Sequence, residues 1–156
     1  MACGSHFETG NCVCDILRQI ADAQSDVVTN ECTTSCEQSI NDLLGGTLPA
    51  ANDLDTVPVI LYCDCEPFKG FGAPTGTTGD LGSFGNVVGS FFFRVKSVDD
   101  NCCTVLELLR DPNDNNDNPD SPADQSTDNL EATGICITVN VNCFCHITCL
   151  PAISAL

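Results

Sequence analysis

Hydrophobic residues in the first part of the chain recur at the spacing of a short amphipathic helix. The apolar stripe consists of Val13, Ile16, Leu17 and Ile20. Residues three and four apart lie on one face of a helix, so this stripe predicts a helix with one apolar side. Asn11 is a suitable N-cap, and Asp15 in the first turn suits the positive end of the helix dipole.

A second short helix is predicted directly after Cys32. Thr34 and Glu37 stand three residues apart, which is the spacing of a capping box, and they precede apolar residues at helical intervals. Gly45 and Gly46 follow, and glycine commonly ends a helix.

After Pro49 the pattern changes to that of β-strands. Segments 57–65, 87–98 and 102–109 are rich in β-branched and aromatic residues, and the last two are separated by an Asp-Asp-Asn turn, which predicts a hairpin. Segment 68–85, between the first two of these segments, is expected to form turns. It contains six glycines: Gly70, Gly72, Gly76, Gly79, Gly82 and Gly85.

The clearest pattern lies at residues 135–149, where apolar residues and cysteines occupy the odd positions and mostly polar residues the even ones. Alternation with a period of two predicts one long strand, straight or bent, with its odd positions toward the core. We therefore predict a mainly β fold, a sandwich or barrel-like antiparallel sheet with two short N-terminal helices. We expect residues 1–10 to be a flexible arm and residues 11–156 to be a single β-rich assembly domain.

Residues 111–129 contain almost only Asp, Asn, Pro, Ser, Thr, Gln and Ala. Such a segment offers little apolar surface to bury, so we expect a solvated, mobile loop that does not pack. Calcium binding is the alternative, although the spacing of an EF-hand loop is absent.

The formal net charge is −17, with 22 carboxylates against five Lys and Arg residues. Phosphate binding requires clustered basic residues, so nucleic acid and anionic membrane surfaces are not expected partners. No apolar run approaches the roughly 20 residues of a membrane-spanning helix. The sequence also has no Walker loop, GxSxG or HExxH motif, so none of these nucleotide-binding or catalytic sites is expected, and we expect no cofactor.

The chain contains 13 cysteines, an odd number, so at least one cannot pair within the chain. Such a density is typical of secreted disulfide scaffolds, yet the first residues show neither the basic start nor the apolar run of a signal peptide. The candidates for disulfides or cross-links are Cys3, Cys12, Cys14, Cys32, Cys36, Cys63, Cys65, Cys102, Cys103, Cys136, Cys143, Cys145 and Cys149.

Strand geometry limits which cysteines can pair. Two cysteines separated by one residue on a strand share a face but cannot bridge without strain, so Cys143 with Cys145, and Cys63 with Cys65, should each face a neighbouring element. Cys102 and Cys103, if both lie on a strand, point to opposite faces, and one of them is a candidate for an outward link.

Metal binding is the alternative reading of the cysteines. Cys143, Cys145 and Cys149 could ligate zinc, but structural zinc sites usually take ligands from turns with a C-x(2–4)-C spacing, and a regular strand would turn His146 away. His146 is expected on the polar surface, and His6 in the flexible arm. A thiol redox enzyme is a third possibility, against which stands the absence of a C-x-x-C motif.

Residues 93–106 and 136–150 resemble the spore coat protein Y and Z family, and the second segment does so in its cysteine spacing. The similarity to this family extends to residues 12–17, to the spacing of Cys32 and Cys36, and to the Thr-Val-Pro at 56–58. The resemblance implies a non-enzymatic protein that assembles with itself and other coat proteins into cysteine-cross-linked, often hexagonal lattices in the crust or exosporium of bacterial endospores. It also implies synthesis in the mother-cell cytoplasm and oxidation after the mother cell lyses.

We therefore expect a self-assembling structural protein of the spore surface, with zinc binding as the alternative function. At least one thiol should reach another subunit. The strongest candidates are Cys3, Cys12, Cys14 and one of Cys102 and Cys103.

Overall fold

The computed structural model describes residues 12–25, 32–45, 53–76 and 82–156. The chain divides into two compact units, residues 1–33 and residues 34–156, and the β-sheet belongs to the second. The predicted flexible arm, residues 1–10, lies outside the described residues. That residues 11–156 act as one assembly domain stays a prediction. Within the described parts, neither helix is long and apolar enough to cross a membrane.

Helix α1, Cys12–Ser25, forms where the apolar stripe predicted it, and its expected cap Asn11 lies outside the described residues. Helix α2, Cys36–Leu43, also forms, but its cap differs from the prediction. Ser35, not Thr34, is the N-cap, because its side chain accepts a hydrogen bond from the Gln38 N–H. At the other end Gly45 adopts a φ of +101°, the left-handed conformation that ends helices, as expected.

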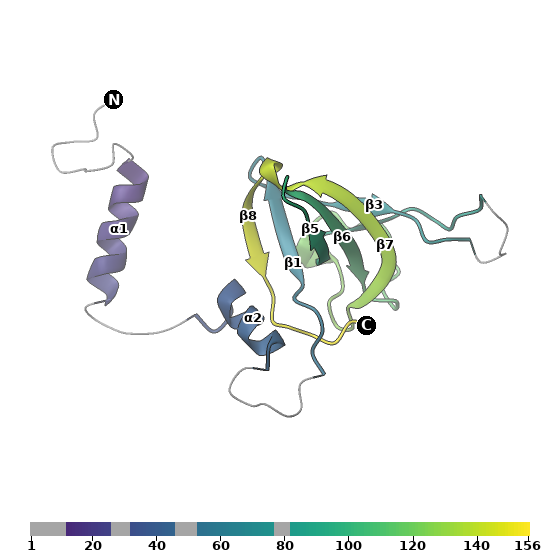
Figure 1. Ribbon diagram of the computed structural model, residues 1–156, viewed down its shortest axis with the longest axis horizontal. Coiled ribbons are helices and arrows are strands. Elements are labelled where there is room, and N and C mark those ends of the chain that lie inside the picture. The colour runs from purple at the N-terminus through teal and green to yellow at the C-terminus, as the bar shows by residue number, and fades with distance from the viewer. Residues whose placement is uncertain (1–11, 26–31, 46–52, 77–81) are drawn as a thin grey trace. The chain divides into compact units, whose positions relative to one another are not determined.

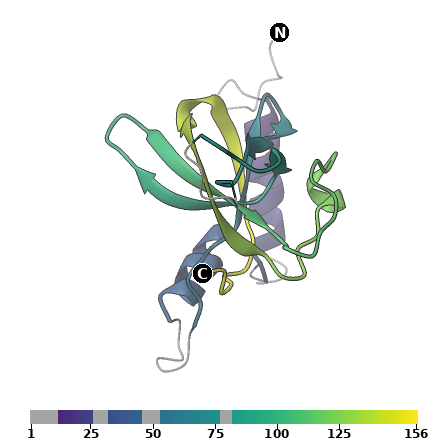
Figure 2. The same ribbon diagram turned by 90° about the vertical axis from the view of Figure 1, so that its right-hand side faces the viewer.

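The second unit is built on an antiparallel sheet, which confirms the predicted mainly β fold (Figure 1). The strand order is β2-β1-β5-β6-β7, and β8, outside this order, pairs with β1 along its whole length. The strands are β1 (Val59–Cys63), β2 (Glu66–Pro67), β5 (Phe93–Val98), β6 (Cys103–Arg110), β7 (Glu131–Asn140) and β8 (Phe144–Cys149). Figure 2 shows the sheet curling, with the β5–β6 hairpin extending to one side.

Two short strands, β3 (Gly70–Gly72) and β4 (Val88–Ser90), form a separate ribbon. The glycine-rich segment is therefore not turns alone. Gly72 is required where the ribbon meets the sheet, since a Cβ at this position would collide with the Ile135 side chain. The predicted strand 87–98 is two strands, because the Ser90 hydroxyl accepts from the Phe92 N–H and bends the chain between β4 and β5.

The predicted long strand at 135–149 is also two strands. A 3₁₀ turn, η2 (Val141–Cys143), separates β7 from β8, and the Asn140 side chain accepts from the Asn142 N–H at its start. β7 pairs with β6, and after the turn the chain continues as β8, which pairs with β1. Phe144, an even position, packs on the core, whereas Cys149 at the end of β8 keeps the predicted inward packing of the odd positions.

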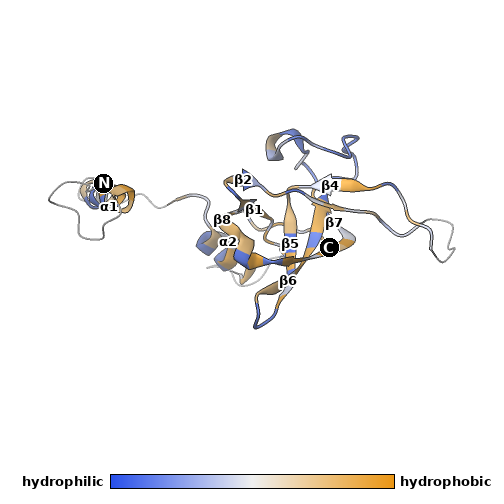
Figure 3. Ribbon diagram, turned by 90° about the horizontal axis from the view of Figure 1, so that it is seen from above, coloured by the Kyte–Doolittle hydropathy of each residue, from blue (hydrophilic) through white to orange (hydrophobic). Residues whose placement is uncertain are grey.

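Both faces of the sheet bury apolar side chains. One core cluster comprises Val59, Leu61, Phe93, Leu106, Leu108 and Ile135. The opposite face is covered by a second cluster of Ile60, Phe91, Phe92, Leu109, Leu130 and Ala155. Figure 3 shows hydrophobic residues along the strands and hydrophilic ones at the tip of the β5–β6 hairpin.

The expectation that residues 111–129 do not pack is wrong. Pro119 is fully buried, and Gln125 is 4% exposed. The Gln125 side chain accepts from the Phe91 N–H and donates to the Ser90 hydroxyl and the Leu109 carbonyl. Polar side chains can be buried when hydrogen bonds replace those to water, so a segment with few apolar residues is fixed here mainly by its polar ones.

Candidate functional site

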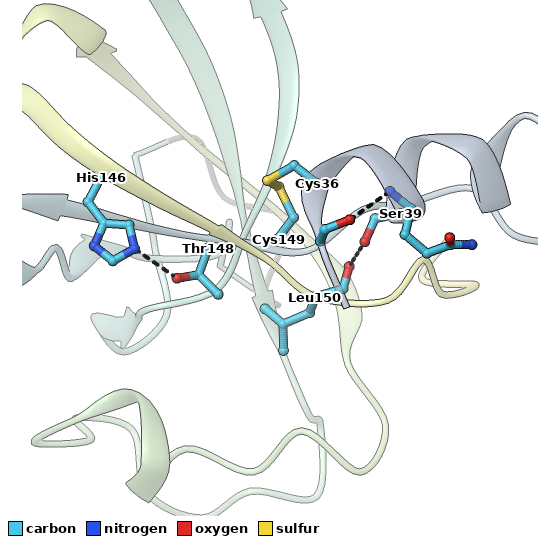
Figure 4. The surroundings of a disulfide bond; sticks show 8 residues. Cys36, Ser39, His146, Thr148, Cys149 and Leu150 are labelled. Atoms are coloured by element: carbon cyan, nitrogen blue, oxygen red, sulfur yellow. Dashed lines mark hydrogen bonds between the residues drawn. A yellow bond between two sulfur atoms is a disulfide. The ribbon is translucent and has the colours of Figure 1, made fainter. Parts of the chain in front are cut away.

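Most cysteines of the second unit lie in three places, of which the first is a disulfide between Cys36 and Cys149 (Figure 4). It joins the first residue of α2 to the last residue of β8, with 4.8 Å between the Cα atoms. Beside it, the Ser39 hydroxyl donates to the Leu150 carbonyl at 2.7 Å, and Ser39 is 1% exposed. The bond and the hydrogen bond together attach α2 to the edge of the sheet.

The second place is a group of three thiols at the other end of β8, which we call the thiol cluster: Cys63, Cys143 and Cys145. Cys63 is the last residue of β1, and Cys143 ends η2. The pairing of β1 with β8 shifts here, with Tyr62 opposite His146 and Cys63 opposite Phe144, so Cys145 is the extra residue of a bulge. Its Sγ lies 3.6 Å from the Tyr62 carbonyl oxygen.

The thiols of the cluster influence one another. Desolvation is the main cause that raises the pKa of Cys63, followed by a hydrogen bond with the Cys143 thiol and by the charges of Cys143, Asp64 and Cys145. Cys143 and Cys145 are exposed, and Cys63 is half-buried. The thiols of the cluster are therefore neighbours at one end of β8 and are accessible from solvent.

The predicted positions of two cysteine pairs are wrong. Cys65 does not share a strand with Cys63, because Asp64 and Cys65 form the two-residue turn between β1 and β2, with φ of 50° and 65°. Cys143 does not share a strand with Cys145, because it lies in η2. Cys63 does face a neighbouring element, since it lies opposite Phe144, the first residue of β8.

The third place is the β6–β7 face opposite the first core cluster. Cys103 pairs with Asn140 and Cys136 with Glu107, and both cysteines are exposed. Cys102 is not on the strand, contrary to the expectation, but in the hairpin turn at a φ of 61°. Its carbonyl accepts from the Val141 N–H, which holds this turn against η2.

The remaining cysteines belong to the first unit. Cys12 is disulfide-bonded, Cys32 is an exposed thiol, and the Arg18 guanidinium lies 3.8 Å from the Cys14 Sγ. Cys3 and His6 lie outside the described residues.

The zinc alternative requires Cys143, Cys145 and Cys149 to converge. In the structure Cys149 is bonded to Cys36, so its sulfur is not a thiolate ligand in this state. Across the described ranges no three His, Cys, Asp or Glu side chains form a group that could hold a metal ion. His146 is exposed and stacks on the Tyr62 ring, with centroids 4.2 Å apart.

An apolar groove, which the sequence pattern did not predict, lies between α2 and the strands β1, β5 and β8. Its volume is about 460 Å³, and Ile40, Val95 and Ile147 on its wall are each close to half exposed. Arg94 and Asp55 also line the groove. Burial opposes ionisation of Asp55, but hydrogen bonds from the Ala155 N–H, the Thr56 hydroxyl and the Leu156 N–H, together with the Arg94 charge, hold its pKa below the usual value.

Comparisons with known proteins agree on one family. The family model described as spore coat protein Z matches residues 1–152. Spore coat protein Z of Bacillus subtilis (strain 168) is 30% identical over 148 residues, which cover 92% of this chain and 90% of that protein. No solved structure matches.

Proposed function

Because the chain belongs to the spore coat protein Z family, we propose that it is a structural protein of the spore surface that assembles with itself into a sheet cross-linked by cysteines. The finer parts of this proposal are the lattice, which we take to be hexagonal, its place in the outer coat, crust or exosporium, and synthesis in the mother cell. Other coat proteins are expected partners, and catalysis is not part of the role.

The observation that carries the proposal is the distribution of thiols over the second unit. The exposed ones among its described residues are Cys65, Cys103, Cys136, Cys143 and Cys145. They lie on the β1–β2 turn, on the β6–β7 face and at the thiol cluster, so cross-links can leave the unit in more than one direction. A molecule that tiles a plane needs contacts in several directions, whereas a simple dimer needs one.

Noncovalent contacts must come before the cross-links. A disulfide forms when the Cα atoms lie about 4.4–6.8 Å apart, so two subunits must already be docked before their cysteines can react. The apolar groove beside α2 provides a surface of the kind that packs against another molecule. The charge of −17 opposes close approach, and salt or divalent cations should therefore promote assembly.

Electron microscopy of the purified full chain tests the proposal. We expect ordered sheets at moderate salt, which survive dilution after oxidation and come apart when a reductant is added. A chain that stays monomeric at every salt concentration, both reduced and oxidised, would contradict it.

A further inference from the structure

The thiol cluster at one end of β8 has three cysteines, so a disulfide between two of them leaves the third as a free thiol. Cys63 lies opposite Phe144, which places it beside Cys143, the residue just before Phe144, and the two thiols interact. Cys145 is displaced into the bulge, and its sulfur contacts the Tyr62 carbonyl instead. The cluster therefore contains one pair in contact and one further thiol exposed to solvent.

We propose that Cys63 and Cys143 form an intramolecular disulfide on oxidation, and that Cys145 remains as the thiol by which this end of the sheet links to a neighbouring subunit. The second half rests on the proposed function, because it requires a neighbour. The first half concerns a single chain and can be tested without assembly.

Local geometry disfavours disulfides between cysteines that are separated by a single residue. Cys143 and Cys145 are separated only by Phe144, whose side chain packs on the core and fixes the backbone between them. A bridge between cysteines so close in the chain would strain this backbone. Cys65 is held in the β1–β2 turn at positive φ and is separated from Cys63 only by Asp64, so the same argument applies to it.

The new bond would hold β8 at its second end. Cys149, opposite Val59 at the beginning of β1, is already bonded to α2. Cys143 lies just before β8, next to Phe144, which is opposite Cys63 at the end of β1. With both bonds formed, the edge strand β8 is fixed at each end. Edge strands are the part of a sheet most prone to open, so this arrangement suits a protein exposed at a surface.

The chemistry requires an oxidant, for which a low-molecular-weight disulfide is sufficient. One cysteine thiolate attacks this disulfide, releases one small thiol and becomes a mixed disulfide. The second cysteine then attacks the protein sulfur and releases the other small thiol. Two S–H bonds are lost and one S–S bond forms in the protein. The two electrons reduce the small disulfide, and its two sulfurs leave with the two protons as thiols.

Cys63 must act as an attacking thiolate whichever cysteine reacts first. It attacks either the small disulfide or the mixed disulfide formed on Cys143. The groups facing Cys63 are Cys143, Cys145 and Asp64, none of which carries a positive charge, and its pKa is raised. The reaction should therefore accelerate steadily as the pH increases from 7 to 9.

Peptide mapping tests the pairing. Reduced full chain is treated with oxidised glutathione, the monomer is isolated by size exclusion, free thiols are alkylated, and chymotrypsin cleaves after Phe144 to separate Cys143 from Cys145. The experiment uses the Cys65→Ser variant, in which Cys63 is the one cysteine in the chymotryptic peptide between Tyr62 and Phe68. We expect a Cys63–Cys143 peptide and an alkylated Cys145. The same mapping on a mixture of ¹⁵N-labelled and unlabelled chains shows whether the bond lies within one chain. In that case the two halves of each linked peptide are either both labelled or both unlabelled.

Variants separate this inference from the proposed function. Cys145→Ser should leave the Cys63–Cys143 bond intact and remove cross-links at this end. Cys136→Ser changes the peptide that carries Cys143, since residue 136 lies in it, but should leave the bond to Cys63 intact. A Cys63–Cys145 peptide, or alkylation of both Cys63 and Cys143 in the oxidised monomer, would overturn the pairing. Failure to form sheets would contradict only the proposed function, because the pairing is read from the monomer.

Discussion

The Arg110 guanidinium lies 3.9 Å from the Asp114 carboxylate, and both side chains are about nine-tenths buried. The same guanidinium donates to the Gly89 and Asn116 carbonyls. One cation at the end of β6 therefore connects the acidic segment 111–129 to the β4 strand. This contact explains how a segment with so few apolar residues acquires a fixed path.

Replacement of Arg110 by Met should destabilise the second unit strongly. The change leaves the Asp114 carboxylate buried without its cation, and breaking such a pair typically costs about 3–5 kcal/mol. The free energy of unfolding, measured by urea denaturation, gives the size of the loss. Asp120→Asn in the same segment is the matched control, because Asp120 is exposed. Equal stability of the two variants would show that Arg110 does not anchor the segment.

Removal of the Cys36–Cys149 bond by Cys36→Ser should lower the stability of the oxidised protein by about 2–4 kcal/mol, since the bond closes a loop spanning 113 residues. The comparison is made by denaturation with and without reductant. In reductant the difference between the variant and the original chain should shrink. Cys103→Ser, which changes an exposed thiol on β6, should have little effect under either condition.

The stability of the segment 111–129 should fall in acid. A hydrogen bond from the Ser126 hydroxyl is the main cause that lowers the pKa of Asp111, and one from the Asn116 N–H does the same for Asp114. A lowered pKa in the folded state means that the ionised form stabilises the fold. This contribution is complete well above 3.8, the reference pKa, and is lost as the pH falls below it.

Thermal denaturation between pH 2 and pH 7 measures this effect. The Asp111→Asn variant should be less stable at neutral pH and should lose less stability on acidification than the original chain. A pH profile parallel to that of the original chain would contradict the role of Asp111.

Cross-linking at the β6–β7 face should depend on Cys103 and Cys136. The double replacement by Ser should reduce the oligomers seen on non-reducing gels, while sheets formed at moderate salt still appear in the microscope. If the sheets themselves were lost while circular dichroism showed an intact fold, these thiols would be needed for the noncovalent association of subunits and not only for their cross-linking.

The accuracy of the sequence predictions differed between elements for identifiable reasons. The period-two pattern at 135–149 identified strands with an apolar face, because alternation is a local property. It could not place the break at η2, because the break exists to let β8 pair with β1, some 80 residues earlier in the chain. The cap of α2 was misplaced by one residue, since Thr34 and Ser35 are equally good caps by type.

The sequence by itself determined the mainly β fold, both helices, the β5–β6 hairpin and the family, all of which depend on local periodicity or on matched segments. Only the tertiary structure decided which cysteines meet. Cys36 reaches Cys149, and Cys63 reaches Cys143, because the order of strands in the sheet brings distant segments together. Likewise, Gln125 is buried because its amide finds partners on Ser90 and Leu109, and no local pattern encodes partners so far away in the chain.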